Sequence, residues 1–288
     1  MTSALEVRSA GPLITVQDFG RPGYAHLGVP RSGALDAPAL ALANRLVGNA
    51  ADAAGLEITM SGCTLRAIDA ATIAISGAIA RLTIDGREHG YAEPVAVRPG
   101  ATVQVGPAIA GVRTYLAVAG GIDVPPVLGS CSTDTLSGLG PAPLRAGDVL
   151  SIGPATGEPP HVDFVPPPRV GETPVRLQIR LGPRDEWFTR EARVLLTKAY
   201  TLSVDSNRIG ARLAGVPLPR VDAGRQLPSE GIVMGAVQVT AGGMPLVFLA
   251  DHPTTGGYPV IAVVDSADLP RLAQARPGDS VMFHGLER

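Results

Sequence analysis

Short apolar runs separated by turn residues dominate the chain. Between Gly55 and Ile152, and again from Val175 to Phe283, apolar and polar residues alternate or form brief apolar stretches bounded by Gly, Pro and Asp. A period of two is typical of β-strands. The pattern predicts strands at residues 56–60, 72–75, 81–84, 101–105, 114–118, 175–181, 246–250, 260–264 and 280–283. We therefore expect a mainly β fold, a sandwich or a barrel.

Helical periodicity is confined to a few short segments. The clearest helix follows Asp36, a good N-cap residue, has Pro38 in its first turn and stops at Gly48. A second helix is expected from Thr189 to Leu196, and a third begins at Asp268. Trp187, the only tryptophan, is expected to anchor the core.

A proline-rich stretch separates the two series of strands. It contains Pro154, Pro159, Pro160, Pro166, Pro167, Pro168 and Pro174. This composition favours an extended, stiff connector over a packed element. The sequence thus predicts an N-terminal β-rich domain at residues 1–153, a linker at 154–174 and a C-terminal domain at 175–288.

Composition excludes several classes of protein. The 288 residues can bury a core without disulfides, and a net charge of -2 provides no basic surface for nucleic acid or for a membrane. Cys63 and Cys131 are too few for a disulfide framework or a zinc cage. We see no signal-peptide pattern and no long apolar run, so a cytoplasmic protein with reduced thiols and no metal site is expected.

Lys198 is the only lysine among 24 basic residues. The chain therefore has no Gly-Lys-Ser/Thr phosphate loop and no Met-Lys-Met setting for biotin attachment. It also lacks a Gly-x-Ser-x-Gly elbow, a His-Glu-x-x-His helix and a Cys-x-x-Cys pair. A nucleotide phosphate would need arginines, a helix N-terminus or a partner protein.

The richest polar stretch is the loop at residues 251–259, between two predicted strands. It combines an acid, an imidazole, two hydroxyls and a phenol with flexible glycines and stiff prolines. A long hairpin loop that satisfies its own backbone is the alternative, but four kinds of hydrogen-bonding side chain within eight residues favour a site. The side chains are those of Asp251, His252, Thr254, Thr255 and Tyr258, with Gly256 and Gly257 between them.

Polar residues on other turns extend this candidate site. Asn207 and Arg208 follow a strand, and Glu230 lies on a later turn. Carboxylates and an imidazole suit proton transfer, whereas an arginine suits binding of a carboxylate or an acyl phosphate. These residues alone indicate a site for a small acid. Arg21 lies on a Gly/Pro turn with Gln17 and Asp18, where capping of the turn is favoured over ligand binding on spacing alone.

Several stretches together resemble a known family. They are residues 15–23 (TVQDFGRPG), 28–30, 32–36, 46–49, 56–58, 115–122, 206–210, 227–231 and 251–259. In this order they are similar to the biotin-dependent carboxyltransferase-like family, whose members are named allophanate hydrolase subunit 2 or the C subunit of 5-oxoprolinase, or antagonise a kinase inhibitor. The resemblance covers essentially the whole chain. At Cys131 the chain departs from many relatives, which carry an arginine there.

The resemblance implies two units of the cyclophilin-like β-barrel type. It also implies a companion protein similar to allophanate hydrolase subunit 1 or to the B subunit of 5-oxoprolinase. The leading hypothesis is a subunit of an ATP-dependent complex that opens 5-oxoproline to glutamate and is inactive alone. One alternative is transfer of a carboxyl group from carboxybiotin to urea or a similar amide. Another is non-catalytic binding of a kinase-inhibitor protein. ATP would be bound by this chain or its partner, and biotin would come from another chain.

In the leading hypothesis the candidate residues divide into two groups. Asp251, His252 and Glu230 are predicted to be catalytic and to handle protons. The residues predicted to bind and orient the amide substrate are Asn207, Arg208, Thr254, Thr255, Gly256, Gly257, Tyr258 and Arg21.

Overall fold

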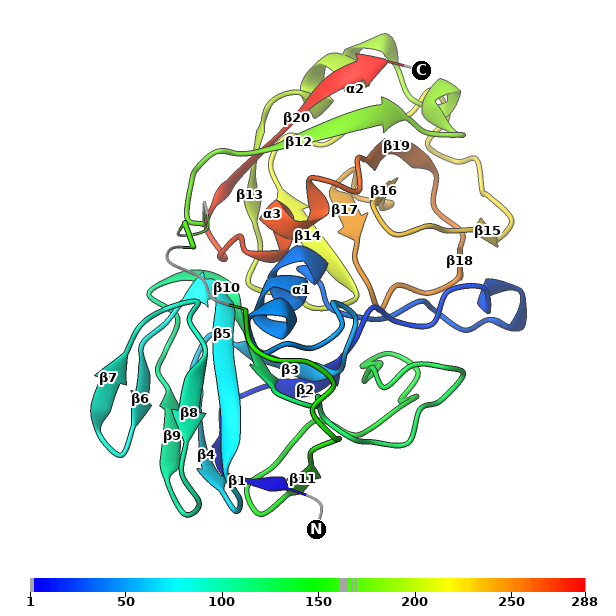
Figure 1. Ribbon diagram of the computed structural model, residues 1–288. Helices are drawn as coiled ribbons and strands as arrows, with labels where there is room; N and C mark the ends of the chain where they lie inside the picture. The colour runs from blue at the N-terminus through cyan, green and yellow to red at the C-terminus, as the bar shows by residue number, and fades with distance from the viewer. Residues whose placement is uncertain (1–2, 161–164, 167, 169, 288) are drawn as a thin grey trace. The chain divides into compact units, whose positions relative to one another are not determined.

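The structure is a computed structural model that describes residues 3–160, 165, 166, 168 and 170–287 (Figure 1). The chain forms two compact units. Unit 1 comprises Met1–Arg21, Asp36–Asp134 and Gly138–Val170, and unit 2 comprises Pro22–Leu35, Thr135–Ser137 and Gly171–Arg288. Strands dominate both units, and the described residues contain only three short α-helices. The prediction of a mainly β fold is confirmed.

Unit 1 is built from two antiparallel sheets. The first has the strand order β11-β1-β4-β9-β6-β7 and the second β2-β3-β10-β5-β8. Their strands are β1 Ala4–Ala10, β2 Ile14–Gln17, β3 Gly55–Thr59, β4 Cys63–Ala67, β5 Ala71–Ile79, β6 Leu82–Ile84, β7 Arg87–His89, β8 Val95–Val97, β9 Thr102–Val105, β10 Ala110–Val118 and β11 Val149–Ser151. Residues of both sheets, such as Leu65 and Leu116, share one buried cluster. The sheets therefore enclose a common core.

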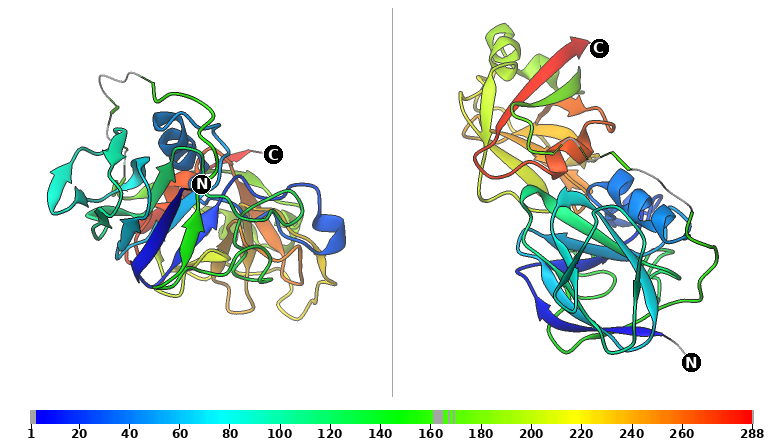
Figure 2. Two further views of the ribbon diagram at one scale, coloured as in Figure 1. Left: turned by 60° about the horizontal axis from the view of Figure 1, so that its bottom comes forward. Right: turned by 60° about the vertical axis from the view of Figure 1, so that its left-hand side comes forward.

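The expected first helix is α1, Ala37–Leu46. Its first turn is fixed as predicted, because the Asp36 carboxylate accepts a hydrogen bond from the Ala39 amide at 3.1 Å. The helix covers β5 and β10 on the outer face of their sheet (Figure 2). Since β10 is thereby covered on both faces, it is buried along almost its whole length.

Unit 2 contains a closed barrel in the order β12-β19-β16-β17-β14-β13-β20. Its strands are β12 Val175–Leu181, β13 Ala199–Leu202, β14 Gly210–Ala214, β16 Ala236–Val239, β17 Pro245–Phe248, β19 Val260–Val264 and β20 Ser280–Glu287. Two short helices flank it, α2 Arg190–Leu196 and α3 Leu269–Ala273, and a separate ribbon pairs β15 Glu230–Gly231 with β18 Thr255–Gly256. Closure of the barrel leaves it without a free sheet edge.

The apolar core of the barrel includes Trp187, as predicted. This side chain is 7% exposed and lies in the apolar cluster of the barrel, and the Arg225 guanidinium lies 4.0 Å from its ring centroid. Because the chain has no other tryptophan, fluorescence of Trp187 reports the folding of unit 2 alone.

The two units differ from the domains expected from the sequence. Residues 22–35 and 135–137 lie inside the predicted first domain but belong to unit 2. Their bonding explains this, because Ser32 donates its amide to the Ala250 carbonyl at 3.0 Å and Thr135 donates its amide to the Asp251 carboxylate at 3.0 Å. Within the predicted linker, residues 161–164, 167 and 169 lie outside the described part of the chain.

Glu57 faces the interior of unit 1 and is 1% exposed, so it needs partners. Arg113 provides one, with its Nε 3.6 Å from Glu57 Oε1. The hydroxyl of Tyr115 donates to Glu57 Oε2 at 2.7 Å and accepts a hydrogen bond from the Asp36 amide at 2.8 Å. Burial, together with the charges of Glu57 and Asp36, raises the pKa of Tyr115 well above its usual value.

We expect Tyr115→Phe to lower the free energy of unfolding by about 1–3 kcal/mol, because it removes a buried hydrogen bond to a carboxylate. Urea denaturation followed by circular dichroism measures the loss. Tyr91→Phe is the matched control, since the half-buried Tyr91 hydroxyl donates to the neutral carbonyl of Gly77 at 2.8 Å. A loss for Tyr115→Phe no larger than that of Tyr91→Phe would contradict the prediction.

Candidate functional site

The polar site of unit 2 lies in two loops, one before β14 and one after β17, which continue the hydrogen bonding between these strands. Strand β14 pairs with β17, with Gly210 opposite Phe248. Beyond the ladder, the Leu249 amide donates to the Ile209 carbonyl at 3.0 Å and the Asp251 amide to the Arg208 carbonyl at 3.1 Å. This continuation brings the side chains of Arg208 and Asp251 together.

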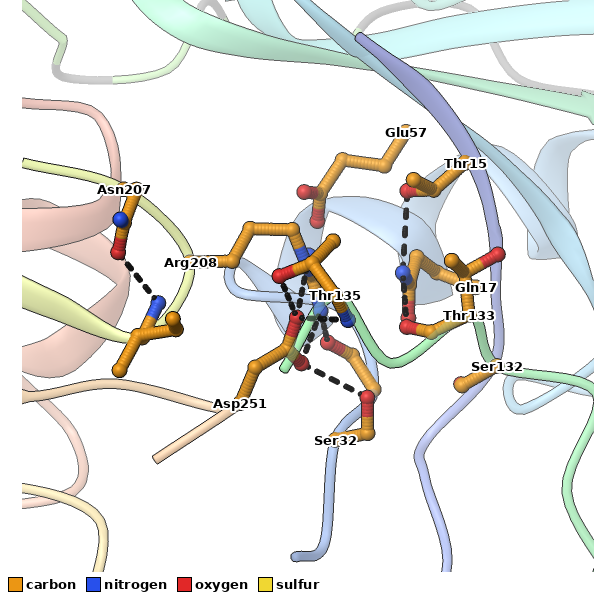
Figure 3. A network of polar contacts seen from close by, with 12 residues as sticks. Thr15, Gln17, Ser32, Glu57, Ser132, Thr133, Thr135, Asn207, Arg208 and Asp251 are labelled. Atoms are coloured by element: carbon orange, nitrogen blue, oxygen red, sulfur yellow. Dashed lines mark hydrogen bonds and ion pairs between the residues drawn. The ribbon is translucent and has the colours of Figure 1, made fainter. Parts of the chain in front are cut away.

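Asp251 is held by five hydrogen bonds (Figure 3). Arg208 donates from Nε to Oδ2 at 2.9 Å and from Nη2 to Oδ1 at 3.0 Å. The Ser32 hydroxyl donates to Oδ1 at 2.7 Å, and Thr135 donates its amide to Oδ2 at 3.0 Å and its hydroxyl at 2.7 Å. Arg208 Nη2 also donates to the Gly33 carbonyl at 2.7 Å.

These contacts favour a positioning role for Asp251. The side chains of Asp251 and Arg208 are 0% and 1% exposed, and donors occupy both carboxylate oxygens. Burial disfavours the charged form, but the Arg208 charge and the hydrogen bonds from Arg208 and Thr135 outweigh it and lower the pKa of Asp251. The carboxylate therefore stays ionised and joins four segments of the chain. Proton transfer by Asp251 stays a prediction. The hydrogen bonds that keep its carboxylate ionised do not favour that role.

The lowered pKa predicts how the stability of unit 2 depends on pH. The contribution of the ionised Asp251 carboxylate to the free energy of unfolding is complete above the ordinary Asp pKa of 3.8. It is lost as the pH falls below that value and through the lower pKa of the folded state. We therefore expect a smaller free energy of unfolding at about pH 3 than at about pH 7. Urea titrations at the two pH values, followed by Trp187 fluorescence, measure this difference in the free energy of unfolding. Asp251→Asn should flatten this dependence, and an unchanged dependence in that variant would contradict the assignment.

His252 follows directly and is 6% exposed. Its Nδ1 lies 2.8 Å from the Pro253 carbonyl oxygen. Because a carbonyl only accepts, Nδ1 must carry the proton, so in the neutral ring Nε2 is a proton acceptor. The Phe248 ring packs against the imidazole with centroids 6.1 Å apart. Of the predicted catalytic residues in this loop, His252 has the geometry better suited to proton transfer.

The remainder of the loop forms a ribbon with the segment around Glu230. Glu230 pairs with Gly256 and Gly231 with Thr255, and the Ile232 amide donates to the Thr254 carbonyl at 2.9 Å. Gly256 packs closely against Ile232, so a side chain at this position would displace the end of the Ile232 side chain. Gly257 and Thr255 are exposed, and Thr254 is half-buried.

Two arginines that the sequence interpretation did not single out lie beside this ribbon. Arg184 donates from Nε and Nη2 to Glu230 Oε2 at 3.0 and 2.7 Å. The Arg220 guanidinium lies 5.9 Å from the ring centroid of Tyr258, which is 43% exposed. The half-buried Glu230 and the exposed Tyr258 are thus each accompanied by a cation. The turn position of Arg184, directly after the predicted strand at 175–181, is the only sequence signal for it.

The Asn207 side chain bonds to the backbone of its own turn. Its Oδ1 accepts hydrogen bonds from the amides of Ile209 at 2.8 Å and Gly210 at 3.3 Å. This arrangement is an Asx turn, which fixes the chain direction just before β14. The predicted contact of Asn207 with substrate stays a prediction.

Arg21 lies in unit 1, on the turn after β2. Asp18 of the same turn accepts hydrogen bonds from the hydroxyls of Ser130 and Ser132 and from the Cys131 amide. Arg21 donates to the carbonyls of Val127 and Ser132. The turn is therefore fastened to the segment at residues 127–134. Burial, followed by the charge of Asp18, raises the pKa of the Cys131 thiol, and both cysteines are free thiols.

With this geometry in place, comparison with known proteins decides the family. A family model described as carboxyltransferase domain, subdomain A and B, matches residues 27–285. The chain belongs to this family. It is 39% identical over 283 residues to the C subunit of an Escherichia coli (strain K12) 5-oxoprolinase, covering 97% of this chain and 90% of that protein.

Larger proteins contain the same carboxyltransferase domain. The chain is 35% identical to a urea amidolyase of Saccharomyces cerevisiae over 98% of its own length but only 16% of that protein. The crystal structure of the K. lactis urea amidolyase superposes with a TM-score of 0.89 at 32% identity, covering 99% of this chain and 19% of that one. The chain thus corresponds to a small part of both urea amidolyases.

No group of three or more His, Cys, Asp or Glu side chains among the described residues could hold a metal ion. In the same part of the chain, every helix is too short or too polar to span a lipid bilayer.

Proposed function

We propose that this chain is one subunit of an ATP-dependent complex that opens the ring of 5-oxoproline to glutamate. It would act with a companion carboxyltransferase-like protein similar to the B subunit of 5-oxoprolinase. In this reaction water cleaves the lactam C–N bond, its oxygen goes to the carbonyl carbon, and the nitrogen gains a proton. The supporting observation is the similarity to the C subunit of 5-oxoprolinase, which covers 97% of this chain and 90% of that protein.

The geometry of unit 2 supports a division of labour in this reaction. His252 would transfer protons through Nε2, since its Nδ1 proton is held by the Pro253 carbonyl. The ribbon with Glu230, Thr255 and Tyr258 would contact substrate or the companion protein. Asp251 and Arg208 would hold the loops in place from the interior of unit 2.

ATP is proposed to bind to the companion protein. The only lysine, Lys198, lies after Thr197, the C-cap residue of α2, and its amide donates to the Leu195 carbonyl at 3.0 Å. This exposed helix end lacks the glycine-rich loop that cradles phosphates. The same lysine has no biotin-attachment context, so any biotin would be carried by another chain.

Co-purification from the native source with this protein as bait tests the proposal. The recovered complex is assayed for ADP release with 5-oxoproline, with urea and without substrate. We expect a companion protein of the carboxyltransferase type and ADP release stimulated by 5-oxoproline alone. A complex that is indifferent to both substrates, or recovery of a kinase inhibitor without substrate-dependent turnover, would contradict it and favour the binding-protein alternative.

Carboxyl transfer is the second candidate, and the match to the carboxyltransferase family model supports it. In that reaction carboxybiotin on another chain would donate its carboxyl group to a urea nitrogen. Avidin sequesters biotin, so it should abolish urea-stimulated ADP release if this candidate holds. Full activity in the presence of avidin would exclude it.

A further inference from the structure

Unit 2 contains a cavity of about 450 Å³ whose lining residues differ from those predicted for the loop at residues 251–259. The cavity lies between helix α2 and two connections of the barrel, at residues 216–223 after β14 and at residues 241–243 between β16 and β17. Leu195, Val216 and Pro217 are among the apolar residues of its wall. A volume of this size is within the range of about 300–1,000 Å³ that is usual for small-molecule sites.

Arg220 contributes a cation to the wall of this cavity. Its Nη2 donates to the carbonyls of Val239 at 2.7 Å and Thr240 at 3.3 Å, and its guanidinium lies 5.9 Å from the ring centroid of Tyr258. Among the described residues these are its partners, and no carboxylate forms an ion pair with it. Backbone carbonyls thus hold the guanidinium in position, while its charge stays available to an anion.

Glu191 contributes a charge of opposite sign to the same cavity. It lies in the first turn of α2, and no described residue forms a hydrogen bond or ion pair with its carboxylate. The backbone holds this turn beside Arg220, because Phe188 forms a β-bridge with Arg220 and the Thr189 amide donates to the Pro219 carbonyl at 3.1 Å. Two opposite charges therefore line one cavity without pairing with each other, so a ligand can engage both.

The third wall, at residues 241–243, leaves space for a ligand. A side chain added at Gly242 would meet no other atom within 4 Å, and the φ of Gly242 is not in the left-handed region. A larger residue at this position therefore fits the backbone and projects into open space. This makes Gly242 a place where the cavity can be narrowed without changing either charge.

We propose that this cavity binds an apolar α-amino acid. The ligand carboxylate accepts hydrogen bonds from the Arg220 guanidinium, its ammonium group donates to the Glu191 carboxylate, and its side chain packs against Leu195, Val216 and Pro217. A zwitterion satisfies both charges at once. A carboxylic acid without the ammonium would leave Glu191 unpaired, and an amine without the carboxylate would leave Arg220 unpaired. The site is separate from the chemistry proposed above and does not depend on it.

Four probes separate the three contacts. Leucine offers all of them, leucinamide lacks the carboxylate, 4-methylpentanoate lacks the ammonium group, and glycine lacks the side chain. Binding of each is measured by calorimetry on the full chain. We expect leucine to bind at least about tenfold more tightly than any of the other three, because each lacks a charge-assisted hydrogen bond or a buried apolar side chain.

Variants assign these contacts to residues. Arg220→Met should weaken leucine binding by about tenfold or more and abolish the preference for leucine over leucinamide. Glu191→Gln should abolish the preference for leucine over 4-methylpentanoate. Gly242→Leu keeps both charges and narrows the cavity, so it should weaken the binding of leucine more than that of glycine. Lost stability alone would not produce these three separate changes of selectivity.

Arg212→Met and Glu186→Gln are the matched controls. Both residues lie exposed in unit 2, outside the lining of the cavity, so leucine should bind to these variants as it does to the wild type. Circular dichroism and Trp187 fluorescence verify the fold of every variant.

Saturation by none of the four probes would overturn the inference, as would equal affinity for leucine and leucinamide. Leucine binding that is unaffected by both Arg220→Met and Gly242→Leu would place the ligand elsewhere and would also overturn it. All of these measurements use the chain alone. Their outcome is therefore independent of whether the assembled complex hydrolyses 5-oxoproline.

Discussion

Asp251→Asn is expected to lower the free energy of unfolding of unit 2 by about 3–5 kcal/mol, the range for breaking a buried ion pair. An asparagine keeps the shape but loses the charge opposite Arg208. Its amide nitrogen would also face donors from Arg208, Ser32 or Thr135, whichever way it turned. Urea denaturation followed by Trp187 fluorescence measures the effect in unit 2.

Asp205→Asn provides the control for this substitution. Asp205 lies exposed on the turn before Arg208, so its replacement changes the same charge without breaking a buried contact. A double-mutant cycle with Arg208→Met separates the pair from the remainder of the network. We expect strong coupling, because either single change leaves one buried partner uncompensated. A loss for Asp251→Asn as small as that for Asp205→Asn would show that Asp251 does not hold the loops.

This result would also decide how activity data on the loop are to be interpreted. If Asp251 acts by holding the segments that contain Ser32, Thr135 and Arg208, its variants lose activity in proportion to their loss of folded protein. A residue that transfers protons would instead lower kcat while the free energy of unfolding changes little.

Local features of the sequence were sufficient to predict the elements of the fold. The strand predicted at 260–264 coincides with β19, and that at 175–181 coincides with β12. The helix after Asp36 was predictable because its capping bond spans only three residues. Asp85 and Gly86 form the hairpin turn between β6 and β7, both with positive φ, which is typical of an Asp-Gly pair.

Contacts between distant residues could not be predicted in this way. The hydrogen bond from Ser32 to Asp251 spans 219 residues and that from Thr135 spans 116. No periodicity links such positions, so the sequence identified Asp251 and Arg208 as polar residues on turns without showing that they form an ion pair. For the same reason, inclusion of residues 22–35 and 135–137 in unit 2 had no compositional signal.

The residue types predicted for the site were informative where a short-range constraint exists. Gly256 was identified from backbone freedom, but its φ is not positive, and the structure shows instead a close approach to the Ile232 side chain. Glu230 was identified as an acid on a turn, whereas its partner Arg184 comes from 46 residues earlier and was missed. The candidate site is therefore predictable as a set of residues but not as a set of contacts.

His252→Gln is expected to lower kcat of the assembled complex by about 10²–10⁴-fold, the usual contribution of a general acid or base. Glutamine can still donate to the Pro253 carbonyl but does not exchange a proton near neutral pH. The free energy of unfolding should therefore change little. Substrate-stimulated ADP release, measured from about pH 5 to about pH 8, should also lose the pH dependence that a histidine confers.

His26→Gln tests whether this effect is specific to the buried imidazole. His26 also belongs to unit 2, and its Nδ1 lies 3.0 Å from the Gly23 carbonyl oxygen, the same kind of contact in an exposed position. We expect full activity from that variant. If both variants behave alike, or if His252→Gln retains wild-type kcat, proton transfer must be assigned to Glu230 or to the companion protein. In that case His252, like Asp251, would serve to hold the loop at residues 251–259.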